Sequence, residues 1–314
     1  MARARVARHT GGMRVVVAPG QGSQKPGFLA PWLEDPAVAD TLAQWSDAIG
    51  LDLITHGTTS DAETIRDTRI AQPLIVAAGL IAGRALQARL AEKPHYAGHS
   101  VGEFTAAALC GILSDVEALQ LVAARGEAMA EAAALTPTGM SAVVGADLHT
   151  LEGPLRERGL TPANVNSSTQ VVAAGELDAL GALGENPPEG TRVIALEVAG
   201  AFHTDFMQPA QSALEAAAGT LTPADPTTVI YTNRDGSSVS SGAKYLELLV
   251  SQMTSPVRWD RCMEAFSTAG ATELIELAPA GALVGLAKRS LPGVLTRRLD
   301  LPEHLDAFFA DEKG

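Results

Sequence analysis

The chain has 314 residues, a formal net charge of −13 at pH 7 and a hydrophobic fraction of 46%. This length suits one large domain or a domain with a sizeable insertion, and the composition is that of a globular protein rather than a disordered one. The acidic balance argues against nucleic acid as the main partner, because phosphate binding needs a broad basic surface. It leaves room for a small basic patch that meets one acidic protein.

The cysteines and the apolar segments exclude further classes. Cys110 and Cys262 lie far apart, with no CxxC motif and no paired histidines near either, so we expect neither a zinc site nor a disulfide framework. No apolar run approaches the roughly 20 residues that span a bilayer. The basic opening "MARARVARHTGG" lacks the apolar region of a signal peptide. We therefore expect a disordered leader over residues 1–12 and a soluble cytoplasmic protein.

The first ordered elements alternate between strand and helix. The β-branched run at 15–17 predicts a buried strand that ends at a Pro-Gly break. Pro73 predicts the first turn of a helix over "PLIVAAGLIAGRALQARL". The segment "HYAGHS" predicts a strand and a turn, and "VGEFTAAALCGIL" predicts a helix that ends near Gly111. A second long helix follows, with Ser114 as its N-cap and Glu117 completing a capping box.

The pattern changes after residue 137. Residues 140–198 predict a compact β-α-β-α-β segment, which is small enough to be an inserted domain. Long helices then return with the short strands "TVIYTN" and "TELIEL". Because strands alternate with helices, the expected fold class is α/β with a largely parallel sheet.

The stretch "GHSVG", residues 98–102, fits the nucleophile elbow G-x-S-x-G. A serine on a sharp turn from strand to helix has strained backbone angles, so its neighbours must be nearly without side chains. At the start of a helix the backbone N–H of Val101 would donate to an acyl oxyanion, which the helix dipole also favours. Ser100 is therefore the candidate nucleophile. The alternative is a glycine-rich loop with a solvated serine.

Six blocks in a fixed order extend this motif: "PGQGSQ", "TRIAQP", "GHSVGEF", "AARGEAM", "GAFHTDFM" and "SQMTSPVRW". In these blocks the chain resembles malonyl-CoA:acyl-carrier-protein transacylases and the acyltransferase domains of fatty-acid and polyketide synthases, from Met13 onward. The resemblance implies a hydrolase-like α/β core with an inserted ferredoxin-like subdomain. The expected division is a large subdomain over 13–137 and 205–314 and a small subdomain over 138–204.

A serine nucleophile needs a general base. By resemblance His203 is the family's catalytic histidine, on a loop between a strand and a helix; spacing alone does not single it out among seven histidines. We expect His99 to support the turn. The family orients its histidine with a backbone carbonyl, a role that falls on Gln252 here, so Asp205 is expected to have no catalytic duty and the site to be a Ser–His dyad.

The remaining site residues follow from the same resemblance. Gln21 would supply the second oxyanion donor; the rival phosphate loop fails because neither glycine spacing in "PGQGSQKPGF" is completed. Arg125 would grip the free carboxylate of a malonyl group, since guanidinium and carboxylate form two parallel hydrogen bonds, and Met129 would line the pocket. The alternative for Arg125 is a snorkelling surface arginine.

Three further features concern the substrate and the partner protein. Acyltransferases with phenylalanine at the position of Phe202 tend to take malonyl rather than methylmalonyl groups, because the ring limits the space beside the α-carbon. Asn166 matches a polar block of the small subdomain and is a weak candidate for substrate contact. Lys288 and Arg289, or the pair at 297–298, would form a basic patch for an acidic acyl carrier protein, unless they are only a solvated charged face.

The resemblance implies transfer of a malonyl group from malonyl-CoA to the phosphopantetheine thiol of acyl carrier protein through a malonyl-serine intermediate. Such an exchange of thioesters needs no metal, nucleotide or redox cofactor. Two alternatives stay open. One is a serine esterase or thioesterase on the same elbow, against which stand Arg125 and the lack of a triad acid. The other is a non-catalytic carrier-binding subunit.

Overall fold

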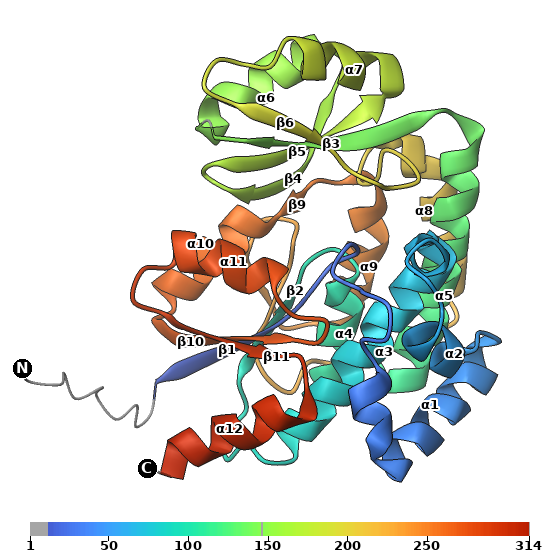
Figure 1. The fold of residues 1–314 in the computed structure, drawn as a ribbon, viewed down its shortest axis with the longest axis vertical. Coiled ribbons are helices and arrows are strands. Elements are labelled where there is room, and N and C mark those ends of the chain that lie inside the picture. Colours follow the sequence, from blue (N-terminus) through green and yellow to red (C-terminus); the bar gives the residue numbers. More distant parts are fainter. Residues whose placement is uncertain (1–11, 146, 314) are drawn as a thin grey trace, which may run out of the picture.

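The computed structural model describes residues 12–145 and 147–313, which form two sheets with helices around them (Figure 1). The leader expected over 1–12 lies, apart from Gly12, outside the described residues, as does His9. The larger sheet occupies the middle of the molecule. The smaller sheet lies at one end of the long axis, above the large sheet in the view of Figure 1.

The large sheet has six strands, of which five are parallel. Its strands, in spatial order, are β11 (Leu295–Leu299), β10 (Ala271–Leu277), β1 (Met13–Ala18), β2 (His95–Gly98), β7 (Ile230–Tyr231) and β8 (Ser238–Val239). Only β8 runs antiparallel to its neighbour. The expectation of a largely parallel sheet is therefore confirmed.

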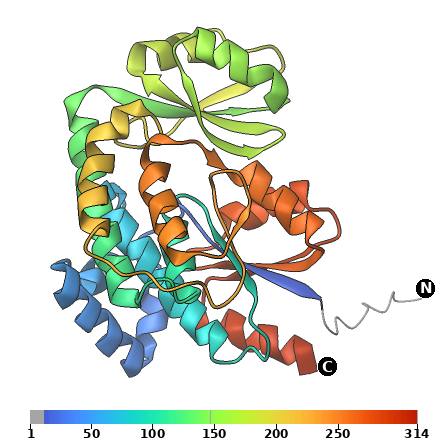
Figure 2. The same cartoon turned by 180° about the vertical axis from the view of Figure 1, so that it is seen from behind.

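Helices cover both faces of this sheet, as a buried parallel sheet requires. The alternation of side chains along β1 shows the two faces. Val16 packs in the core formed by α3 (Thr68–Gln87), α4 (Gly102–Leu109) and α5 (Asp115–Leu135). Val15 and Val17 pack on the other face against α10 (Trp259–Thr268) and α11 (Ala282–Ser290). Figure 2 shows the arrangement from behind. The other helices of the large part are α1 (Pro36–Ile49), α2 (Leu53–Thr58), α8 (Gln208–Ala218), α9 (Gly242–Ser251) and α12 (Pro302–Lys313).

The segment expected to be β-α-β-α-β has one more strand. Its elements are β3 (Thr138–Val144), α6 (Leu148–Glu157), β4 (Thr161–Ser167), β5 (Gln170–Glu176), α7 (Leu177–Glu185) and β6 (Arg192–Ala195). The prediction missed β4 because its sequence, TPANVNS, is rich in residues that favour turns; pairing with β5 and β9 (Val257–Arg258) overrides that preference. The sheet order is β6-β3-β5-β4-β9, so β9, from the large part of the chain, extends the small sheet.

Two helix starts show what local signals can predict. The capping box of α5 is present: the Ser114 hydroxyl accepts from the Glu117 amide, and the Glu117 carboxylate accepts from the Ser114 amide. The start predicted at Pro73 is wrong. Asp67 accepts a hydrogen bond from the Arg69 amide and starts α3 at Thr68, which leaves Pro73 inside the helix.

The expectation about apolar runs also needs correction. Among the described residues, α3 is long and apolar enough, by length and composition, to cross a membrane. However, 78% of its apolar window is buried inside the protein, and α3 packs against α4 and α5. It is the central helix of the core on that face of the sheet.

Candidate active site

The candidate nucleophile lies on a strained turn between β2 and α4. Ser100 has a backbone φ of 53°, one of two positive values outside glycine in the described residues. The flanking glycines are required by close approach. A Cβ on Gly98 would lie 1.9 Å from the carbonyl carbon of Gly102, and a Cβ on Gly102 would lie 2.2 Å from the carbonyl oxygen of Ala18. The elbow therefore has the geometry expected from the sequence, with its helix N-terminus directed at the serine.

The side chain of Asn233, which follows β7, holds this turn from the other side. Its Oδ1 accepts from the Ser100 amide at 2.7 Å, and its Nδ2 donates to the Gly98 carbonyl at 2.7 Å. Asn233 is 1% exposed. Two short, buried hydrogen bonds stabilise the strained backbone of the nucleophile.

The second positive φ outside glycine, 62°, belongs to His203, on the loop between β6 and the short 3-10 helix Asp205–Met207. Its Nε2 lies 2.8 Å from Ser100 Oγ, and its Nδ1 lies 2.9 Å from the backbone carbonyl of Gln252. The carbonyl can only accept, so Nδ1 carries the proton and Nε2 is free to accept one from the serine. Asp205 is exposed, and the histidine's orienting partner is a main-chain oxygen.

Burial and the nearby positive charge of Arg125 lower the pKa of His203 to about 3. The imidazole is therefore neutral at pH 7, which is the form that a general base requires. Neutral His203 and the hydroxyl of Ser100 lie at hydrogen-bonding distance and are a candidate base and nucleophile.

Arg125, on α5, lies beside this pair and is 1% exposed. Its Nη2 lies 3.3 Å from Ser100 Oγ and donates to Oε1 of Gln252 at 2.9 Å, while Nη1 donates to Oε1 of Gln72 at 2.6 Å. Phe104 presents its ring to the guanidinium, 5.6 Å from Cζ to the ring centroid. The surface alternative for this arginine is therefore wrong.

The same guanidinium is incompletely satisfied. Among the described residues, Nε of Arg125 is buried and has no hydrogen-bond partner, and no carboxylate lies within ion-pair distance. Burial lowers the pKa of Arg125 to about 10, against the attraction of Glu103, so the group remains charged at pH 7. A buried cation with an unused donor, within reach of a nucleophile, is suited to an anionic ligand.

Comparison with known proteins agrees with this geometry. The family model of the acyl transferase domain matches residues 15–293. The chain belongs to the acyl transferase family. A "Malonyl CoA-acyl carrier protein transacylase" of Mycobacterium bovis is 50% identical over 94% of this acyltransferase and 98% of the relative; one from Salmonella typhimurium is 32% identical over 93% and 97%.

Solved structures give the same grouping. The crystal structure of MCAT from Mycobacterium tuberculosis matches with a TM-score of 0.91 and 49% identity, covering 94% of this acyltransferase and 99% of that chain. A malonyl-transacylase in complex with its type II PKS acyl-carrier protein matches with a TM-score of 0.88 and 30% identity, covering 96% and 100%.

Three buried polar residues of the acyltransferase's site were not predicted as site residues: Gln72, Glu103 and Asn233. Gln72 accepts from Arg125 and donates from Nε2 to Sδ of Met129 at 3.2 Å. Gln72 and Glu103 stand in the quoted blocks "TRIAQP" and "GHSVGEF", which was the available signal. Asn233 ends the predicted strand segment "TVIYTN", which belongs to none of the quoted blocks, so no sequence signal marked it as a site residue.

Glu103 is 1% exposed, and its Oε1 accepts from the Asn233 amide at 2.7 Å and from the Tyr245 hydroxyl at 3.3 Å. Its Oε2 accepts a short hydrogen bond from Nε2 of Gln252. Burial raises the pKa of Glu103 to about 7, and these donors oppose the rise. The carboxyl thus joins the elbow to the residue that orients His203.

The predicted oxyanion and substrate residues lie around this centre. The side chain of Gln21 donates to Thr68 Oγ1 at 3.3 Å and accepts from Gln72 Nε2 at 3.4 Å, so it faces the start of α3. Val101 is at the N-terminus of α4. Met129 and Phe202 are buried, at 1% and 5% exposure. Gln21 therefore reaches Arg125 through one intervening glutamine.

Other predicted residues lie farther from the nucleophile. Asn166, on β4, accepts a hydrogen bond from His99 Nε2 through its Oδ1 at 2.8 Å, and the His99 ring meets Trp259 edge-on. Both residues support the elbow, as was expected for His99. Lys288 and Arg289 are exposed in the last turn of α11, and Arg289 lines the same groove as Ser167, the residue after Asn166.

The remaining histidines do not approach Ser100 through any observed hydrogen bond. His95 bonds the Tyr231 hydroxyl at 3.0 Å, His56 bonds Ser60 at 3.0 Å, and His304 accepts from the Asp300 amide. The side chain of His149 lies outside the described residues. Within the described ranges, no cluster of three or more histidine, cysteine or acidic side chains could hold a metal ion.

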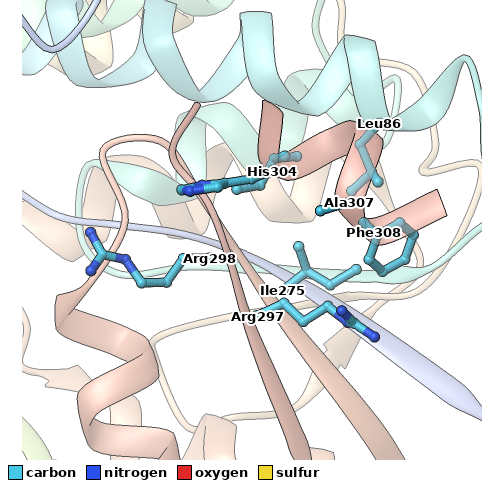
Figure 3. A pocket seen from close by; sticks show the side chains of 8 residues that line it. Leu86, Ile275, Arg297, Arg298, His304, Ala307 and Phe308 are labelled. Atoms are coloured by element: carbon cyan, nitrogen blue, oxygen red, sulfur yellow. The ribbon is translucent and has the colours of Figure 1, made fainter. Parts of the chain in front are cut away.

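A separate cavity of about 240 Å³ lies between α3, β11 and α12 (Figure 3). Its lining includes Arg297 and Arg298, the second pair considered for carrier binding. Arg297 is bonded to Glu273 at 2.7 Å, and Arg298 is bonded to Asp300 at 2.8 Å. These intramolecular pairs favour Lys288 and Arg289 as the basic patch. No residue of the nucleophile site lines this cavity.

Proposed function

We propose that the acyltransferase transfers a malonyl group from malonyl-CoA to the phosphopantetheine thiol of acyl carrier protein through a malonyl-serine intermediate. The observation that carries the proposal is the buried guanidinium of Arg125, with Nη2 3.3 Å from Ser100 Oγ and with Nε unpaired among the described residues. An acyl chain on Ser100 whose far end is a carboxylate satisfies this cation, whereas an acetyl chain does not. The names of the relatives support the same substrate pair.

In the loading step Ser100 Oγ attacks the thioester carbonyl while His203 Nε2 takes its proton. The Gln252 carbonyl stabilises the imidazolium that forms by accepting from Nδ1–H. The oxyanion of the tetrahedral intermediate accepts hydrogen bonds from Val101 N–H and from Gln21. When the intermediate collapses, the C–S bond breaks, and the CoA thiolate leaves with the proton that His203 held.

In the transfer step the carrier's thiol gives its proton to His203 and attacks the malonyl-serine ester. The C–O bond to Ser100 breaks, and the serine recovers its proton from His203. Water competes poorly because the carboxylate bound to Arg125 fixes the malonyl group and holds its carbonyl in line with the arriving thiol.

The proposal extends to selectivity and to the partner protein. The buried ring of Phe202, next to His203, limits the space beside the α-carbon and disfavours methylmalonyl groups. Lys288 and Arg289 provide a basic patch on an acidic enzyme for an acidic carrier, from fatty-acid or polyketide synthesis. Replacing both by glutamate raises KM for the carrier and leaves loading from malonyl-CoA unchanged; an unchanged KM for the carrier excludes this patch.

The fold supports finer assignments as well. The β-α-β-β-α-β order of residues 138–195, with antiparallel pairing and strand order β6-β3-β5-β4, is typical of a ferredoxin-like unit, and the elbow between β2 and α4 is typical of a hydrolase-like core. We infer a division near residues 137 and 205, and a cytoplasmic location.

A product assay tests the proposal against its two alternatives. Purified enzyme is mixed with malonyl-CoA and a holo acyl carrier protein, and malonyl-carrier and free malonate are measured together, with Ser100→Ala as the control. The proposal expects malonyl-carrier as the main product and none from Ser100→Ala. Free malonate as the main product indicates a hydrolase, and the absence of any covalent malonyl-enzyme indicates a non-catalytic carrier-binding protein.

A further inference from the structure

We propose that Glu103 is a positioning residue for the malonyl pocket: its carboxylate fixes the side-chain amide of Gln252 so that Oε1 of Gln252 faces Arg125. The inference rests on the proposed function, because it concerns how Arg125 is held ready for the acyl carboxylate. Glu103 itself touches neither Ser100 Oγ nor Arg125 through any observed hydrogen bond.

The argument begins with the partners of the Gln252 amide. Its Nε2 donates to Glu103 Oε2 and to the Ser100 carbonyl, the latter at 3.1 Å. Its Oε1 accepts from Arg125 Nη2 at 2.9 Å. Gln252 is 4% exposed, so water does not replace these partners readily.

Only one orientation of this amide satisfies all the contacts. After a half-turn, Oε1 of Gln252 would face two acceptors, Glu103 and the Ser100 carbonyl, and the NH₂ group would face a guanidinium N–H. In each of these contacts an acceptor would face an acceptor or a donor would face a donor. Because the site is buried, the lost hydrogen bonds would cost free energy. Glu103 and the Ser100 carbonyl therefore determine together which end of the amide Arg125 meets, and Glu103 is the one that a side-chain substitution can change.

Two glutamines then hold the guanidinium. Gln252 accepts from Nη2, and Gln72 accepts from Nη1, so the plane of Arg125 is fixed before the acyl chain arrives. A bidentate carboxylate contact depends on that plane. Acetyl loading does not use it, so the ratio of malonyl to acetyl loading reports the orientation of Arg125 separately from the chemistry at Ser100.

The Glu103→Gln variant is the main test. Glutamine has one acceptor oxygen where the site presents donors to both carboxylate oxygens, so the NH₂ group meets either Gln252 Nε2 or the Asn233 amide. The ratio of malonyl-CoA to acetyl-CoA loading is measured as the two values of kcat/KM at about pH 8.5, where the wild-type carboxyl is ionised, and is expected to fall roughly tenfold or more.

A second buried glutamate provides the matched control. Glu276 is 0% exposed and accepts from the Leu283 and Val284 amides at the start of α11, and burial raises its pKa as it does for Glu103. Glu276→Gln is expected to lower stability and to leave the loading ratio unchanged. If Glu103→Gln also loses stability but keeps the wild-type ratio, the proposal is overturned.

A double-mutant cycle tests whether Glu103 acts through Gln252. Gln252→Met removes the amide, and in this background Glu103→Gln is expected to change the loading ratio less than about twofold. If the two substitutions change the loading ratio independently, so that the double variant shows the product of the two single effects, the proposal is overturned. If wild-type enzyme forms no malonyl adduct on Ser100, the proposed function fails and the cycle does not apply.

A measurement on the carboxyl group covers the case in which Glu103→Gln does not fold. The pKa of Glu103 is followed by carbon NMR in wild-type enzyme and in Gln252→Met. Because Gln252 donates to the carboxylate, its loss is expected to raise the pKa of Glu103 further. An unchanged pKa contradicts the contact on which the proposal depends.

Discussion

Two groups of arginines in this molecule differ in what balances their charge. Around Glu273, Arg14 binds one carboxylate oxygen at 2.8 Å and Arg297 binds the other at 2.7 Å, and both lie over the ring of Phe308, as Figure 3 shows for Arg297. Their side chains are 24% and 27% exposed. Arg125 is almost fully buried, and its partners among the described residues are neutral.

The difference indicates which arginine is structural and which awaits a ligand. A part-exposed arginine that already forms an ion pair with a carboxylate contributes modestly to stability. Its charge is balanced, so it is poorly suited to bind an anionic substrate. A desolvated cation held only by amides and a hydroxyl costs free energy until an anion arrives. Charge balance, more than burial alone, distinguishes Arg125, the proposed malonyl anchor, from the arginines of the large sheet.

The largest expected effect comes from removing the anchor. Arg125→Ala is expected to lower kcat/KM for malonyl-CoA loading about 1,000-fold, since truncating one partner of a buried charged pair costs about 2–5 kcal/mol, and to lower acetyl loading less than tenfold. Both are measured by quenched-flow loading of Ser100.

The control is Arg297→Ala. In this variant Glu273 loses Arg297 but is still bound by Arg14. We expect a loss of roughly 1 kcal/mol in the free energy of unfolding and an unchanged ratio of malonyl to acetyl loading. An equal loss of both acyl groups in Arg125→Ala would abolish the distinction between the two groups of arginines.

The Gln21→Ala variant tests whether Gln21 stabilises the oxyanion or instead helps to hold Arg125. If Gln21 donates to the tetrahedral intermediate, its loss lowers kcat about 100-fold or more, and it does so equally for malonyl and acetyl groups. The measurement is single-turnover loading with each acyl-CoA. A loss confined to malonyl would instead assign Gln21 to the Gln72–Arg125 network.

Phe202→Ser tests the space beside the anchored group. Removal of the ring is expected to raise the kcat/KM ratio of methylmalonyl-CoA to malonyl-CoA roughly 10- to 100-fold, because one methyl group in an apolar pocket is worth about 1–3 kcal/mol. Competition between the two thioesters, read as the masses of the acyl-enzymes, gives this ratio. If the ratio does not move, the ring does not set the choice.

The smallest effect concerns pH, and it also depends on the unbalanced charge of Arg125. The pKa of His203 is lowered to about 3 by burial and by Arg125, so the base stays neutral as the pH falls from 7 to 5. Acetyl-CoA loading is expected to lose less than about twofold over this interval, whereas an ordinary histidine would lose roughly 30-fold. Loading rates across the interval decide between these outcomes.

The same pKa affects stability in a defined direction. Below about pH 6.5 His203 is protonated in the unfolded chain but stays neutral in the folded protein. The free energy of unfolding therefore falls as the pH is lowered. The rates must therefore be normalised to folded enzyme. In Arg125→Ala the pKa of His203 is expected to rise, which a histidine NMR titration measures.

Local sequence signals predicted an element correctly where neighbouring residues alone determine its structure. The Ser114 and Glu117 box starts a helix by its own hydrogen bonds, and the helix is there. The start of α3 was predicted five residues late because Pro73 suits a first helical turn, whereas the helix begins after the N-cap Asp67 and keeps Pro73 in its interior. Strand β4 was missed because its own residues favour turns, and its order depends on pairing with the neighbouring β5 and with β9, which is far away in the sequence.

The site shows the same limit. Ser100 was predicted from its motif, and His203 and Arg125 from the family resemblance, and the three side chains meet at hydrogen-bonding distances. Gln72 stands in the quoted block "TRIAQP" and Asn233 stands in none, but neither side chain has a local signature of its role, because an isolated amide in a sequence is usually exposed. Their importance arises only when α3, α5 and β7 bring them against buried charge.

The most direct measurement is mass spectrometry of wild-type enzyme mixed with equal concentrations of malonyl-CoA and acetyl-CoA, with peptide mapping of the adduct. The account predicts a malonyl adduct on Ser100 in large excess over acetyl, and its transfer to holo carrier rather than to water. An adduct on another residue, or equal labelling by both acyl groups, would contradict the claim that a buried, uncompensated arginine selects the substrate.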